Sequence, residues 1–190
     1  GTEKTKYYGA LGYLSQEGLL PGVYFNKVDL NSNISHQLND KLKLGGKLSY
    51  TYSENSLPGS ASSSANVKTS VYRTINDVFP LELREDLSVL QDEIFRFSPR
   101  GWVEDYEKFS TENRVLGNLS LQYKFRKDIV YDMKFGGDYR SSELNVWQGV
   151  GVNPGFQRDG RYSKTSLNRF SYNIDNTISF RPKPIGSHRY

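Results

Sequence analysis

The feature that most constrains this chain is an alternation of apolar and polar residues, with a period of two, over unusually long segments. It is clearest at residues 42–52, 115–125 and 129–140. A β-strand turns successive side chains to opposite faces, so this pattern predicts strands with one apolar and one polar face. In each of these segments, one set of alternate residues (one parity) carries no charge. The other set carries Lys43, Lys47, Lys124, Asp132, Lys134, Asp138 and Arg140.

Weaker alternation continues the pattern along the rest of the chain. No segment shows a convincing helical period, and no apolar run approaches the roughly 18 residues that would predict a transmembrane helix. Several of the alternating segments exceed the usual length of strands in globular proteins, about 3–10 residues. The sequence predicts six strands, at about 4–15, 22–38, 41–55, 112–126, 128–144 and 167–181.

The predicted connections alternate between short and long. Short turns fall at Asn39–Lys41 and Arg126–Asp128, whereas long stretches cover 56–111 and 143–166. Short turns on one rim and long loops on the other are the layout of outer-membrane barrels, whose strands cross a bilayer in about 9–11 residues. We therefore predict an all-β fold, an antiparallel transmembrane β-barrel segment of about six long strands with short periplasmic turns and long extracellular loops.

Aromatic residues near both ends of the apolar parity favour the membrane barrel, because such barrels carry aromatic girdles at both interfaces. A soluble or secreted β-sandwich binding module remains the alternative, since its strands also alternate, with the apolar face turned inward. Periodicity alone does not separate the two. The aromatic residues in question are Tyr50, Tyr52, Tyr139 and Phe170 on the long-loop side, and Phe125, Tyr131 and Phe180 on the short-turn side.

Residues 7–18, with the sequence YYGALGYLSQEG, resemble the SLGYLNQEG strand and loop of SusC/RagA-type TonB-dependent transporters. Residues 25–50, which end in NDKLKLGGKLSY, are similar to the following part of that family, which carries LTDWLKVGANLSYS. Residues 72–74 and 79–80 lie where the family's long outer loop has an RT…P passage. The resemblance is strong over residues 1–55, extends over 112–181 and is weak in the two long loops.

The resemblance implies that residues 1–190 are part of a single TonB-dependent receptor β-barrel domain, without its plug domain. Because six strands cannot close so large a barrel, we expect an internal fragment of a longer polypeptide. The resemblance further implies import of large nutrients, oligosaccharides or peptides, across the outer membrane of a Gram-negative bacterium. The implied partners are outer-membrane lipids, a SusD-like surface lipoprotein as lid, glycan or peptide cargo, and TonB through parts of the protein outside this chain.

Composition argues against other functions. The chain has no cysteine, and its two histidines, His36 and His188, are not spaced as metal ligands. We therefore expect no catalytic residue, metal or cofactor, and no enzyme activity. The 25 Lys and Arg are interleaved with 21 Asp and Glu, which argues against nucleic-acid binding because that needs clustered positive charge. We interpret Asp132 and Asp138, with Lys134 between them and Arg140 beyond, as a mutually neutralised lumen wall.

Aromatic residues in the predicted long loops are the candidate contacts with a partner or a substrate. Exposed rings beside polar groups suit stacking on sugars or packing against another protein. The alternative is that these rings pack the loops against one another. The candidates are Phe95, Phe97, Trp102, Tyr106, Trp147 and Phe156.

Overall fold

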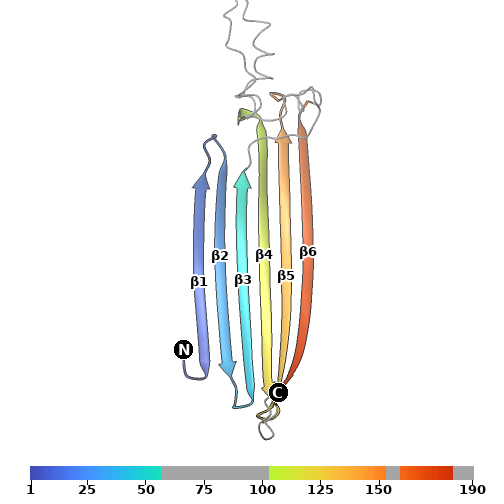
Figure 1. Cartoon of the computed structure of the whole chain (residues 1–190). Coiled ribbons are helices and arrows are strands. Elements are labelled where there is room, and N and C mark those ends of the chain that lie inside the picture. The colour runs from blue at the N-terminus through green and yellow to red at the C-terminus, as the bar shows by residue number, and fades with distance from the viewer. Residues whose placement is uncertain (57–102, 153–158, 182–190) are drawn as a thin grey trace, which may run out of the picture.

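The computed structural model describes residues 1–56, 103–152 and 159–181. These residues form one antiparallel sheet of six long strands, which lie side by side in chain order (Figure 1). The predicted all-β, antiparallel architecture is therefore confirmed. The strands are β1 (Thr5–Glu17), β2 (Tyr24–Gln37), β3 (Leu42–Ser56), β4 (Tyr106–Lys124), β5 (Ile129–Gln148) and β6 (Arg161–Phe180).

Three strands are longer than the alternation predicts. β4 begins at Tyr106 rather than near residue 112, β5 continues to Gln148 rather than ending near 144, and β6 begins at Arg161 rather than near 167. All three extensions lie at the end of the sheet that carries the β1–β2, β3–β4 and β5–β6 connections, which we call the long-connection end. The predicted loops at 56–111 and 143–166 are thereby shortened to 57–105 and 149–160.

The opposite end of the sheet, the short-turn end, has two tight turns where the sequence predicts them. After β2, the Asn39 Oδ1 atom accepts hydrogen bonds from the backbone N–H groups of Lys41 and Leu42, both at 2.9 Å. After β4, the Arg126 guanidinium donates to both carboxylate oxygens of Asp128, at 3.0 and 2.6 Å. An asparagine side chain that bonds the backbone two residues on favours a reversal of the chain, so the turn after β2 is encoded locally.

A small apolar cluster is buried at the long-connection end. Among the described residues, Tyr106 and Val152 are its buried members, with exposed fractions of 6% and 0%. Leu20 and Val146 pack against them. The cluster thus links the β1–β2 connection to β4 and β5.

The remainder of the sheet is a single layer. Within the described residues, no second sheet packs on either face. Most of the large apolar side chains there are consequently half-buried or exposed. β1 and β6 each have one edge without a partner strand in the described part of the chain, so the backbone N–H and C=O groups on those edges are available to further strands.

Candidate functional site

The register of the strands gives the sheet one apolar and one polar face. Residues that pair across strands lie on the same face of the sheet. In all six strands the alternating apolar positions are paired with one another, so they form one face. One cross-strand row reads Tyr7, Ile34, Gly46, Leu119, Phe135 and Ile174. The predicted alternation of an apolar and a polar face is confirmed: Leu44, Leu48, Leu119, Leu121, Met133 and Phe135 share one face, and Lys47, Gln122, Lys134 and Asp138 share the other.

The apolar face carries a band that is bordered by aromatic rings. On β3 this apolar band runs from Leu42 to Tyr52, about 33 Å along the strand at about 3.3 Å per residue. Near the border on the long-connection side, the Tyr50 hydroxyl donates to Asn113 Oδ1 at 2.8 Å. Beyond Tyr52 the same face becomes polar, and its next cross-strand row reads Ser15, Asn26, Glu54, Thr111, Glu143 and Ser166.

On the polar face, the charges closer to the long-connection end form ion pairs. Arg114, Arg140 and Arg169 lie in one cross-strand row on β4, β5 and β6. The Arg114 guanidinium donates to both oxygens of Asp138, at 3.0 and 2.7 Å. Arg140 Nε lies 3.5 Å from a carboxylate oxygen of Glu112. Two carboxylates therefore balance two of the three guanidinium groups in this arginine row.

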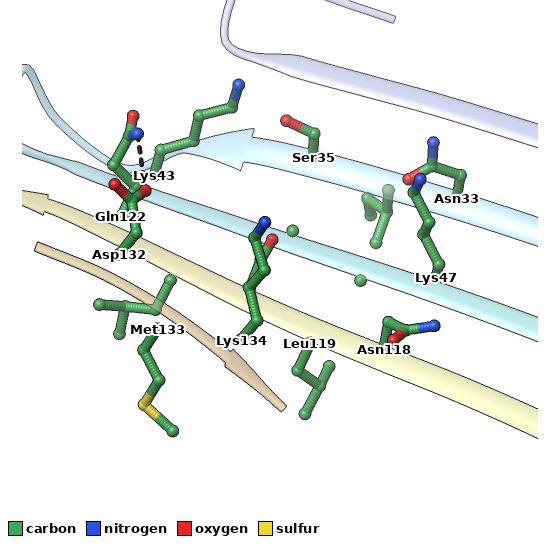
Figure 2. Close-up of a pocket in the computed structure, with 15 residues that line it drawn as sticks. Asn33, Ser35, Lys43, Lys47, Asn118, Leu119, Gln122, Asp132, Met133 and Lys134 are labelled. Atoms are coloured by element: carbon green, nitrogen blue, oxygen red, sulfur yellow. Dashed lines mark hydrogen bonds between the residues drawn. The ribbon is translucent and has the colours of Figure 1, made fainter. Parts of the chain in front are cut away.

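Closer to the short-turn end, three lysines surround a hollow of about 600 Å³ on the polar face (Figure 2). Lys43 and Lys47 flank Gly45 on β3, and Lys134 on β5 lies in the same cross-strand row as Gly45 and Ser120. We call Lys43, Lys47 and Lys134 the lysine triangle. The hollow is also lined by the polar residues Asn33, Ser35, Asn118, Ser120, Gln122 and Asp132.

The side chains of the lysine triangle are held by no partner in the described part of the chain. No ion pair joins any of these ammonium groups to a described carboxylate, and none of them donates a side-chain hydrogen bond there. Leu119 and Met133 point away from the lysines, toward the apolar face (Figure 2). The lysine triangle therefore places three ammonium groups, none of them in an ion pair with a described residue, around a polar hollow that Asp132 also lines. Asp175 on β6 lies directly opposite Lys134.

The predicted mutual neutralisation of Asp132, Lys134, Asp138 and Arg140 is corrected in its partners, because no ion pair joins any two of these four described residues. Asp138 pairs across the strands with Arg114, and Asp132 accepts a hydrogen bond from Gln122 at 2.8 Å. Lys134 is left without a carboxylate at ion-pair distance among the described residues. Parity placed these side chains on one face, but the pairing across strands decides which charges meet.

Two of the six aromatic candidates lie in strands, so their prediction as loop residues is wrong. Tyr106 is the first residue of β4 and is buried in the small apolar cluster. Trp147 lies near the end of β5, beyond the apolar band, and remains 40% exposed. Sequence alternation misses both because the strands continue past the band, where the outward side no longer needs to be apolar. The other four, Phe95, Phe97, Trp102 and Phe156, lie outside the described residues.

The described residues contain no group of three or more side chains that could hold a metal ion. His36 instead has a structural contact, since its Nδ1 atom lies 2.7 Å from the Thr5 hydroxyl on the neighbouring strand. No helix in the part of the chain that the structure describes is long and apolar enough to span a membrane.

The search of solved structures finds this sheet in a known protein. With a TM-score of 0.70 and 16% sequence identity, 97% of the chain aligns with a chain of the RagAB peptide importer in its closed-closed state. The sheet has the fold of part of RagAB. At the level of the fold, the resemblance to SusC/RagA-type transporters is thereby confirmed. The chain spans only 21% of the length of the RagAB chain. No protein-family model matches it, and a search of curated proteins gives no significant match.

Proposed function

We propose that the chain is a wall segment of a TonB-dependent transporter in the outer membrane of a Gram-negative bacterium. The observation that carries this proposal is the apolar band, which extends over all six strands. In the cross-strand rows from Leu42 to Tyr50 it is interrupted, among the described residues, only at Thr5, Ser32, His36 and Asn176. Strands of outer-membrane barrels tilt by about 40°, which converts the 33 Å length along β3 to a height of about 25 Å, as in the apolar band of such barrels. The polar face then lines the lumen, the short-turn end faces the periplasm and the long-connection end faces outward.

The two open edges support the same assignment. The hydrocarbon core of a bilayer offers no partner to backbone N–H and C=O groups, so every strand that crosses it must be paired on both sides. β1 and β6 therefore need neighbouring strands, as in a larger closed barrel. The alternative, a soluble or secreted β-sandwich, needs a second sheet over the apolar face, and the described residues contain none. In the proposed role the chain supplies a wall and loops but no catalysis.

We further propose that the transporter imports large nutrients, oligosaccharides or peptides, beneath a SusD-like lipoprotein lid, and that TonB acts on other parts of the protein. The fold similarity to a peptide importer favours peptides. We assign the lid or cargo contacts to aromatic residues at the long-connection end and in its connections, namely Phe95, Phe97, Trp102, Trp147 and Phe156.

Spin labels on the two faces test the wall assignment. The chain contains no cysteine, so Leu48→Cys and Ser49→Cys place a single label in this segment, on the apolar or the polar face. In the full-length protein in outer membranes, the label at position 48 should respond to oxygen, which concentrates in lipid. The label at 49 should respond to a water-soluble nickel complex. Protection of position 48 from both reagents would overturn the proposal, because it would indicate a covered, sandwich-like apolar face.

A further inference from the structure

We propose that the lysine triangle is a binding site for the carboxylate groups of an acidic peptide that passes along the polar face. This inference rests on the proposed function and adds a class of cargo to it. Lys43, Lys47 and Lys134 are the residues that would carry the binding.

The geometry of the strands brings the three lysines around one point. Lys43 and Lys47 are about 13 Å apart along β3, at about 3.3 Å per residue. Lys134 lies two strands away, level with the midpoint between them. At strand spacings of about 4.8 Å its Cα lies about 12 Å from each of the other two. Because a lysine has a flexible four-carbon stem, the three ammonium groups can converge on a ligand above Gly45.

The floor of the hollow is kept low by small residues. Gly45 has no side chain, and a Cβ atom placed there would lie 2.5 Å from the Ser120 hydroxyl oxygen. A larger residue at position 45 would therefore need Ser120 to move and would fill the centre of the hollow. Ser120 and the nearby Asn118 and Ser35 supply neutral donors around the same space.

The contrast with the arginine row shows why the lysine triangle is the better candidate for an anion. Arg114 already holds Asp138 with two hydrogen bonds. Near the triangle, Asn173 donates to Asp175 at 3.2 Å and Gln122 donates to Asp132, so the two closest carboxylates bond to neutral amides. The three ammonium groups outnumber these two carboxylates, and the excess positive charge attracts anionic groups.

An extended peptide fits the spacing of the site. Its residues advance by about 3.3 Å, and side chains on one of its faces recur at about 6.6 Å. Acidic side chains four positions apart, about 13 Å, would thus match the distances between the lysines. Ammonium–carboxylate hydrogen bonds are charge-assisted and stronger than neutral ones. Because solvent surrounds these ion pairs, each contributes little by itself, and three together would hold the peptide reversibly.

The test is binding of two probes to the full-length protein, purified in detergent and followed by calorimetry. One probe is an oligopeptide of alanine and glutamate, and the other is the same peptide with glutamine in place of glutamate. Combined replacement Lys43→Gln, Lys47→Gln and Lys134→Gln should weaken binding of the glutamate peptide by about tenfold, equivalent to about 1.4 kcal/mol in total, because each solvated ion pair contributes little. The effect should shrink as salt is added, because exposed charges are screened.

Two matched variants separate charge at this site from other causes. The replacement of all three lysines by arginine keeps the charge and should restore binding. The combined replacement Lys27→Gln, Lys108→Gln and Lys164→Gln removes the same charge elsewhere and should leave binding unchanged. Equal binding of the glutamate peptide by the wild type and the Lys43/Lys47/Lys134 glutamine variant would overturn the inference, as would an equal loss for both probes.

Uptake in cells separates this inference from the proposed function. If cells that produce the wild type import neither peptide nor any larger oligosaccharide, the transport proposal fails, whereas the calorimetric result still decides the lysine triangle. If import is intact and the three glutamines have no effect on binding, only the lysine triangle is wrong.

Discussion

At the scale of single residues, the chemistry of Tyr24 shows how the sheet changes beyond the apolar band. Its hydroxyl donates to Glu54 Oε1 at 2.5 Å, on the outward face above Tyr52. This hydrogen bond, together with burial, raises the pKa of Tyr24 from 10.0 to about 12. Because the folded state binds this proton more tightly, the contribution to stability is complete below about pH 10 and is lost as the pH rises toward 12.

Alkaline titration tests this contact. We expect the full-length protein to show a tyrosinate absorbance step near pH 12, and Tyr24→Phe to lower the amplitude of that step by the contribution of one tyrosine. Glu54→Gln, which removes the carboxylate that accepts the hydrogen bond of Tyr24, should shift that contribution to lower pH. A step of unchanged amplitude in Tyr24→Phe would contradict the raised pKa of Tyr24.

At the scale of the elements, the two faces of β4 should tolerate charge differently. Leu119 lies near the middle of the apolar band, and its neighbour Asn118 lies on the polar face. Leu119→Arg should lower the free energy of unfolding by about 2–4 kcal/mol, since it places a charge near the bilayer midplane. Asn118→Arg should cost far less, because it stays in water. Denaturant titration in lipid vesicles measures both, and equal costs would contradict the assignment of the faces.

The tight turn after β4 gives a prediction of orientation. Arg126 and Lys127 are trypsin sites at the short-turn end. They should resist trypsin on intact cells and become accessible once the outer membrane is made permeable. Cleavage at either residue in intact cells would reverse the topology, while cuts within 57–105 are compatible with it.

The strands also show how far sequence reasoning reaches. Residues 42–52, 115–125 and 129–139 were predictable because the apolar band forces one parity to be apolar over its whole height. The extensions at 106–111, 145–148 and 161–166 were not, because beyond the band both faces meet water and the alternation vanishes. Lys43, Lys47 and Lys134 could not be grouped either, since the lysine triangle depends on the register of three strands, which is not visible in a single sequence.

At the scale of the whole molecule, the proposed lid contact can be tested in the connection between β3 and β4. Aromatic anchors often carry much of the binding energy of an interface, so Trp102→Ala should weaken lid association by about 2 kcal/mol or more. Co-purification of the lid with the detergent-solubilised transporter measures this. Tyr123→Ala, at the opposite end of the apolar face, is the control and should leave co-purification unchanged. If Trp102→Ala co-purifies with as much lid as the wild type does, the indole ring serves only to pack the connection.

The open edges of β1 and β6 have a practical consequence for recombinant production. A segment cut to these six strands would present two long rows of unpaired backbone groups and an uncovered apolar face to water. Such surfaces pair with copies of themselves, so we expect the excised segment to accumulate as insoluble, strand-rich aggregate. To be soluble, the excised segment would need partners for the backbone groups on both edges and a cover over its apolar face. In the whole barrel, neighbouring strands pair with both edges.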